Sequence, residues 1–239
     1  MDKIAPRASR IPVIIRAMFQ HFPAHTPLRF GQLRTVVEGF WTSTLSLPHD
    51  LCLGLAEYLQ EQPCETTGLV ESHMRLPPTQ RSLLNALCLS VAEQLQRWAL
   101  LKQEDVGTMQ DAALLMSMRG ALPHHDSFVP NAEANLFWAI SLQETDTDVL
   151  FGNLGQRIEQ QCGTLLVFDA GQPHAVIARE HDVFMRSHFK KTRRQFFAGG
   201  DFKTSVWKDV GVEFDLPKGD ARRDVLKAMV HEKTGLLRK

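Results

Sequence analysis

The chain has 239 residues and a mass of 27.0 kDa, the size of one domain, and its hydrophobic content of 44% is ordinary for a globular protein. Its 27 basic and 27 acidic side chains cancel, so no overall field draws in an acidic membrane or nucleic acid, and nucleic acid is disfavoured as a partner. The apolar run at residues 11–15 is too short for a membrane span, and the scattered cysteines form no Cys-x-x-Cys pair, which favours a reduced, cytoplasmic protein.

Residues 1–110 are expected to support a core rather than to form it. A strand-like segment at 40–45 is followed by leucines at helical spacing from 51 to 59. The clearest helix is predicted over 80–102, and we expect it to pack on the outside of a β-sheet. Its apolar stripe consists of Leu83, Leu84, Leu87, Val91, Leu95 and Trp98.

From residue 111 onward the sequence changes to short apolar runs separated by Gly, Pro, Asn and Asp. The predicted strands are 112–118, 135–142, 149–152, 157–159, 164–168, 175–178 and 183–189. Short strands at close spacing predict a β-sandwich or jelly roll rather than a parallel α/β sheet. We therefore expect a β core over 111–197 and a C-terminal extension over 198–239 with a helix near 221–230, all within one compact domain.

Two histidines and a carboxylate form a candidate metal site. His124 and Asp126 are two positions apart, so in an extended segment they point to the same side and His125 points away. His174 follows a later hydrophobic strand and a Gly-Gln-Pro turn. Two imidazoles and one carboxylate on one face leave the opposite coordination positions open, which is the ligand set of non-haem Fe(II) oxygenases.

The surrounding motifs occur in a familiar order. They are a strand with a Gly turn at 114–120, the His124-x-Asp126 pair, a core strand at 135–142, the strand 162–169, the Pro-His-Ala-Val motif at 173–176 and the strand 183–189. In this order they resemble the core of the 2-oxoglutarate/Fe(II)-dependent dioxygenases, especially the prolyl-hydroxylase-like branch. The resemblance implies a double-stranded β-helix (a cupin-like jelly roll) as the core, flanked by α-helices.

The same resemblance implies the cofactors and the ligand roles. Fe(II) would be held by His124, Asp126 and His174, which are the catalytic residues, and 2-oxoglutarate and O2 would be the co-substrates. Arg186 would bind the far carboxylate of 2-oxoglutarate, with Arg179 as the rival. Many members of the family hold that carboxylate with a Tyr as well, and Ser141 stands at the corresponding position here.

Arg186 also has a physical rationale, because a planar guanidinium binds a carboxylate through two hydrogen bonds. We expect the chain to turn at 179–182 and to return antiparallel through 183–189, which would place Arg186 beside the strand that begins at His174.

The reaction implied is hydroxylation of an amino acid, a peptide or protein side chain, or a small metabolite, with release of succinate and CO2. Asp126 favours this outcome, because the halogenating relatives replace that carboxylate with a small residue. Two alternatives stay open: a jelly roll that binds a ligand without catalysis, and a cupin-like metal protein that needs no co-substrate. The sequence leaves the primary substrate and the oligomeric state open.

Overall fold

The computed structural model describes residues 25–29, 32–35, 40–63, 70–73, 75–124, 135–151, 156–169, 172, 174–181, 185–190 and 192–204, in part by their backbone alone, as at His124 and Arg186. The helices are α2 His49–Glu61, α3 Pro78–Arg97 and α4 Val106–Ala112, with 3-10 turns η1 Gln103–Asp105 and η2 Arg186–Lys190. The strands are β1 His25–Arg29, β2 Gln32–Thr35, β3 Phe40–Thr44, β4 Val70–His73, β5 Leu114–Met118, β6 Ala121–His124, β7 Asn135–Ser141, β8 Thr147–Phe151, β9 Gln156–Glu159, β10 Thr164–Phe168, β11 His174–Ala178 and β12 Gln195–Lys203.

The strands from β5 to β12 wind into two facing antiparallel sheets. One sheet has the order β3-β10-β7-β12-β5-β4 and the other has the order β6-β11-β8-β9, while β1 and β2 form a separate pair. From β5 to β12 most successive strands pass from one sheet to the other, whereas β8 and β9 follow one another within the four-stranded sheet and pair directly. This is the strand order of a double-stranded β-helix, and it confirms the predicted fold. Strand β12 continues beyond position 197, the predicted end of the core.

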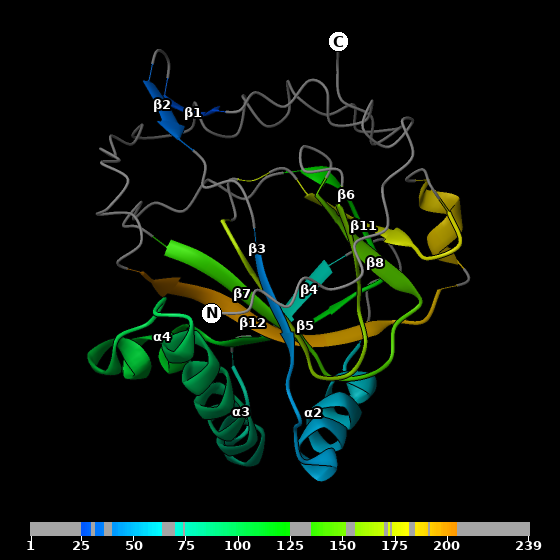
Figure 1. Ribbon diagram of the computed structural model, residues 1–239. Helices are drawn as coiled ribbons and strands as arrows, with labels where there is room; N and C mark the ends of the chain where they lie inside the picture. The colour runs from blue at the N-terminus through cyan, green and yellow to red at the C-terminus, as the bar shows by residue number, and fades with distance from the viewer. Residues whose placement is uncertain are drawn as a thin grey trace.

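The helices cover the outer face of the six-stranded sheet (Figure 1). On β7, Leu136, Trp138 and Ile140 point toward this helical layer and are fully buried, because alternate residues of a strand face opposite sides. The predicted helix-on-sheet packing is therefore confirmed. Strands β3 and β4, which come from the N-terminal region, extend the same sheet at its two edges.

Helix α3 ends earlier than its sequence pattern predicts, at Arg97 rather than 102. Ala99 adopts a positive φ of 58°, and the amide of Leu100 donates back to the carbonyl of Leu95 at 2.9 Å. This is a Schellman-type helix end, which usually has glycine at the left-handed position. Because alanine stands there, the sequence pattern did not reveal the stop or the short helix α4 that follows it.

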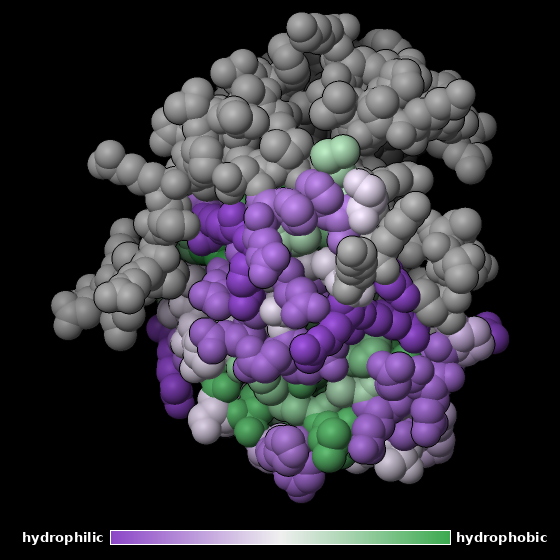
Figure 2. All heavy atoms as spheres, turned by 90° about the vertical axis from the view of Figure 1, so that its right-hand side faces the viewer, coloured by the Kyte–Doolittle hydropathy of each residue, from purple (hydrophilic) through white to green (hydrophobic). Residues whose placement is uncertain are grey.

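A second apolar cluster fills the interior between the two sheets. Its buried members come from both sheets and are Ala121, Val149, Phe151, Ile158, Leu166, Phe168 and Val176, with Phe40, Met118 and Phe137 partly buried against them. Viewed from the η2 side, hydrophilic side chains cover much of the described surface and apolar ones gather toward the lower end of the molecule (Figure 2). None of the helices in the described ranges combines the length and apolarity needed to cross a bilayer.

The strand predicted over 183–189 is wrong in its described part. Residues 186–190 form the 3-10 turn η2, and β11 is paired on one side with β6 and on the other with β8. Since both edges of β11 are already occupied, a strand returning through 183–189 has no free edge beside His174 to pair with. The strand that does follow β11 is β12, and it lies in the opposite sheet.

Candidate functional site

The structure brings the two predicted metal-binding histidine positions together. His124 ends β6 and His174 begins β11, and the two residues are direct partners in the antiparallel ladder between these strands. Directly opposite residues on neighbouring strands share one face of the sheet, with their Cβ atoms about 4.5–5.5 Å apart. That separation allows two imidazoles to reach one metal ion.

The third predicted ligand, Asp126, lies outside the described residues. Within the described ranges no group of three or more His, Cys, Asp or Glu side chains is arranged to hold a metal ion. Asp126 follows the end of β6 by two positions in the sequence. The assignment of all three ligands therefore stays a prediction.

His174 is oriented by the main chain. Its side chain is buried, and its Nδ1 lies 2.9 Å from the carbonyl oxygen of Gln172. A carbonyl oxygen only accepts, so the imidazole donates this hydrogen bond from Nδ1, and in its neutral form it carries its lone pair on Nε2. A hydrogen bond of this kind fixes the tautomer and the ring direction of metal-binding histidines in general. In this arrangement Nε2 is the ring nitrogen that would bind a metal ion.

An aromatic wall stands beside His174. The Phe168 ring meets the imidazole edge-on with centroids 4.7 Å apart, and Phe151 lies 6.3 Å away. Phe40, from the N-terminal strand β3, stacks on Phe151 at 5.0 Å, and Phe137 contacts Phe168 at 5.7 Å. Sequence reasoning did not assign Phe40 to the site, because only the pairing of β3 with β10 brings it there.

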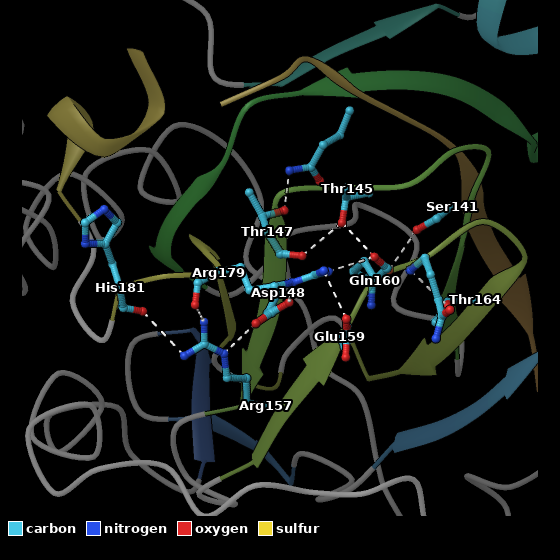
Figure 3. A network of polar contacts seen from close by, with 12 residues as sticks. Ser141, Thr145, Thr147, Asp148, Arg157, Glu159, Gln160, Thr164, Arg179 and His181 are labelled. Carbon is cyan, nitrogen blue, oxygen red and sulfur yellow. Dashed lines mark hydrogen bonds and ion pairs between the residues drawn. The ribbon is translucent and has the colours of Figure 1, made fainter. Parts of the chain in front are cut away.

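The opposite end of the interior is polar (Figure 3). Ser141 is buried at the end of β7 and donates a hydrogen bond from its hydroxyl to Oε1 of Gln160 at 3.0 Å. The Gln195 amide donates to the hydroxyl of Thr147, and both of these side chains are buried. Thr147 is the ladder partner of Ala178, at the end of β11 away from His174. The predicted co-substrate contact Ser141 therefore lies at the polar end, away from the histidines.

Arg179, the rival for the co-substrate role, belongs to a charged network on the outer face of the four-stranded sheet (Figure 3). Its Nε donates to Asp148 at 3.0 Å, a second nitrogen pairs with Glu159 at 3.0 Å, and a third donates to the Gln160 carbonyl at 3.0 Å. Arg157 donates to the other carboxylate oxygen of Asp148, at 2.5 Å. These contacts direct the guanidinium of Arg179 away from the interior.

Arg186, the predicted co-substrate ligand, begins η2 rather than lying in a strand. The turn is held on one side by a stack of His188 on His181, whose ring centroids are 3.5 Å apart with an interplanar angle of 13°. The His181–His188 stack thus helps to fix the backbone of η2, in which Arg186 is the first residue. The role of Arg186 toward 2-oxoglutarate stays a prediction.

No family model and no curated protein matches the chain. Among solved structures it is similar to a viral collagen prolyl hydroxylase from Paramecium Bursaria Chlorella virus-1, in complex with 2-oxoglutarate, at 12% identity over 70% of this chain and 96% of that one, with a TM-score of 0.47. A Pseudomonas putida prolyl-4-hydroxylase matches at 17% identity over 70% and 94%, with a TM-score of 0.41.

A third similar structure is the epimerase SnoN in complex with Fe3+, alpha ketoglutarate and nogalamycin RO. It shares 12% identity over 84% of this chain and 91% of that one, with a TM-score of 0.46. The similar structures are thus 2-oxoglutarate-dependent oxygenases and include prolyl hydroxylases, the branch that the sequence motifs resemble. These similar structures include both hydroxylases and an epimerase.

Proposed function

We propose that this chain is an Fe(II)- and 2-oxoglutarate-dependent oxygenase that hydroxylates an amino acid, a peptide or protein side chain, or a small metabolite. The observation that carries the proposal is the direct pairing of His124 and His174 on neighbouring strands of the jelly roll. The second histidine is buried and is set by the Gln172 carbonyl with its lone pair on Nε2. A buried imidazole of this tautomer, opposite a second histidine position, is what a metal centre requires.

The residues divide the work between holding the metal and shaping its surroundings. His124, Asp126 and His174 would bind Fe(II), which supplies the activation of dioxygen while 2-oxoglutarate is converted to succinate and CO2. The Gln172 carbonyl orients the His174 ring. The aromatic wall around Phe168 excludes water from one side of the site. A dry, fixed surrounding is the contribution that a protein makes to cofactor chemistry.

Arg186 remains the residue proposed to bind the far carboxylate of 2-oxoglutarate, with Ser141 as the hydroxyl contact. The main support is that the described arginines after His174 have other partners. Arg179 is engaged on the outer face of the four-stranded sheet. Arg194 donates to the Gln62 carbonyl and to the Ser117 hydroxyl, each at 3.0 Å.

Metal binding is the first test. We expect anaerobic titration with Fe(II), or with Mn(II) as a redox-stable substitute, to give one ion per chain. His174→Ala should weaken binding by at least about a hundredfold, because loss of even an outer-shell partner of a metal ligand typically costs about 10–100-fold. His49→Ala is the matched control, because His49 is exposed at the start of α2. If His174→Ala binds metal as tightly as the control, the proposed centre is wrong.

Co-substrate binding is the second test. Removing a partly buried charge partner costs about 2–5 kcal/mol, so Arg186→Ala should weaken 2-oxoglutarate binding at least about tenfold. The affinity for Fe(II) should change little. Arg179→Ala serves as the comparison, since its guanidinium has partners on the outer face. Loss of 2-oxoglutarate binding in Arg179→Ala but not in Arg186→Ala would reverse the assignment.

Turnover distinguishes the proposal from its alternatives. Formation of succinate from 2-oxoglutarate in the presence of Fe(II) and O2 is expected, at first without substrate and faster with it. A protein that binds metal but forms no succinate with any amino acid, peptide or metabolite offered would be a binding module. Substrate oxidation that proceeds without 2-oxoglutarate would indicate a cupin-like enzyme.

A further inference from the structure

The turn between β5 and β6 packs tightly against η2. The contact is made by the aromatic ring of Phe189, which leaves room only for glycine at position 120. Gly120 is buried in that turn, and Phe189 of η2 is buried with 2% exposure. A Cβ placed on Gly120 would lie 1.9 Å from one atom of the Phe189 ring and 2.4 Å from two others. Gly120 does not adopt the left-handed backbone conformation, in contrast to Gly163 with φ of +81°. The neighbouring ring, and not the backbone, therefore requires glycine at position 120.

Polar contacts fasten the same junction. The Thr192 hydroxyl lies 3.1 Å from the Phe189 carbonyl and 3.5 Å from the Arg119 carbonyl. The Arg119 guanidinium donates to the Thr192 carbonyl at 3.5 Å. The end of η2 is thus bound to the residue that precedes Gly120 as well as packed on Gly120 itself.

The other side of η2 is held by the four-stranded sheet. His188 stacks on His181, whose carbonyl accepts a hydrogen bond from Arg157 at 3.4 Å. Arg157 also donates to the Arg179 carbonyl and pairs with Asp148 (Figure 3). The η2 turn is therefore fixed between the β5–β6 turn and His181, which is itself bound to β9 through Arg157.

This junction lies between the two parts of the proposed site. Strand β6 leaves Gly120 and ends at His124, about 13 Å along at roughly 3.3 Å per residue. On the other side, positions 186 and 189 lie on the same face of η2, because residues three apart eclipse in a 3-10 helix. The two positions are separated by about 6 Å along the helix axis. The ring that sits on Gly120 is therefore one turn from Arg186 and one short strand from His124.

We propose that Phe189, seated on Gly120, is a positioning residue that sets Arg186 relative to the metal ligand on β6. The inference rests on the proposed function, in which His124 binds the metal and Arg186 the far carboxylate of 2-oxoglutarate. It adds that the distance between these two anchors is set by the Phe189–Gly120 contact. The contact touches neither the metal nor the co-substrate, so it acts only through η2 and β6.

Gly120→Ala is the direct test, with equilibrium binding of 2-oxoglutarate to the Mn(II)-loaded protein as the readout. The added methyl must displace the Phe189 ring and η2 with it, because the ring atoms stand where the methyl would go. A displaced guanidinium loses the geometry that two parallel hydrogen bonds to a carboxylate require, so we expect the dissociation constant of 2-oxoglutarate to rise at least about tenfold. The Mn(II) dissociation constant, measured without 2-oxoglutarate, should stay within about twofold.

Gly107→Ala is the matched control for adding a methyl group. Gly107 lies inside α4, and its added Cβ would meet nothing within 4 Å. Alanine is favoured over glycine within a helix, so this variant should be at least as stable as the parent. Both of its dissociation constants should match those of the parent protein.

A second variant and a rescue make the test decisive even if Gly120→Ala folds poorly. Phe189→Leu removes the flat ring but keeps an apolar side chain, and it should weaken 2-oxoglutarate binding while leaving Mn(II) binding unchanged. Phe189→Ala combined with Gly120→Ala removes the clash, so the double variant should bind 2-oxoglutarate more tightly than Gly120→Ala alone.

The outcomes separate this inference from the proposed function. If the parent protein binds Mn(II) but no 2-oxoglutarate, the proposed function fails, and the inference fails with it. If the parent binds both ligands and Phe189→Leu binds 2-oxoglutarate as tightly as the parent, only the positioning role is overturned. A parallel loss of Mn(II) and 2-oxoglutarate binding in Phe189→Leu would also overturn it, because it would show a purely structural role.

Discussion

Replacing Asp148 with Asn tests the charged network that holds β8, β9 and β11 together. Asp148 is buried, with 5% of its side chain exposed, and each of its oxygens accepts from a different arginine. Arg157 donates at 2.5 Å and Arg179 at 3.0 Å. The amide of Asn keeps one acceptor oxygen but turns an NH2 group toward the other guanidinium, so one of these contacts becomes donor against donor.

The size of the effect follows from the burial of the two arginines. Removing one partner of a fully buried ion pair costs about 3–5 kcal/mol. The Arg157 side chain is 15% exposed and the Arg179 side chain 35% exposed, so solvent replaces part of the lost interaction. Arg179 also keeps its contacts with Glu159 and Gln160. We therefore expect the free energy of unfolding to fall by about 2–4 kcal/mol.

Urea denaturation followed by circular dichroism measures this change, and thermal unfolding checks it at roughly 2–4 °C per kcal/mol for a chain of this size. Glu93→Gln is the matched control, because it removes a carboxylate from an ion pair that is exposed to solvent. Glu93 lies 4.0 Å from Arg97, and their side chains are 70% and 72% exposed. The control should lose at most about 0.5 kcal/mol. An Asp148→Asn variant as stable as this control would show that the network contributes little.

Three further predictions follow from single positions. Gly163→Ala should lower the free energy of unfolding by at least about 2 kcal/mol in urea, because a Cβ there would lie 2.3 Å from the Leu45 carbonyl oxygen in a left-handed backbone; equal stability would contradict it. Burial raises the pKa of the Cys52 and Cys88 thiols to about 12, so stability should fall as pH rises from about 9, where unfolded thiols ionise, toward 12; the fall should be smaller in the Cys52→Ala/Cys88→Ala variant, and an identical fall would refute the assignment. Ser141→Ala leaves a buried glutamine oxygen without its donor, so it should cost about 1–3 kcal/mol and weaken 2-oxoglutarate binding; unchanged calorimetric affinity would remove Ser141 from the co-substrate site.

Local patterns were sufficient to predict most of the core. The strand 164–168 was predicted with its observed bounds, because a continuous apolar run between polar turns has no helical alternative of that length. The helix over 51–59 was recovered from its leucine spacing as α2. The arrangement of these strands as a double-stranded β-helix was predicted from the family resemblance. The periodicity of a single segment carries no information about which strands pair.

Long-range contacts decided the segments that were predicted wrongly. The apolar residues of 183–189 resemble a strand, but Phe189 is buried on Gly120 and both edges of β11 are already paired. The pairing of β3 with β10, which places Phe40 in the site, joins residues more than a hundred positions apart. Burial of this kind depends on the assembled fold and leaves no local signal in the sequence.

The interior of the jelly roll is aromatic at one end and polar at the other, and this difference suits an acidic co-substrate whose two ends differ. At the His174 end it is aromatic and dry, since Phe168 and Phe151 are buried against the imidazole. Toward the other end of β11 it becomes polar, with the Ser141 and Thr147 hydroxyls. A metal held at this end by the predicted ligands would interact strongly with oxygen ligands, because the local dielectric is low. A second carboxylate is costly there, and it needs hydrogen-bond donors and a cation farther along the interior. The Ser141 and Thr147 hydroxyls lie at that polar end, and the proposal assigns the cation to Arg186.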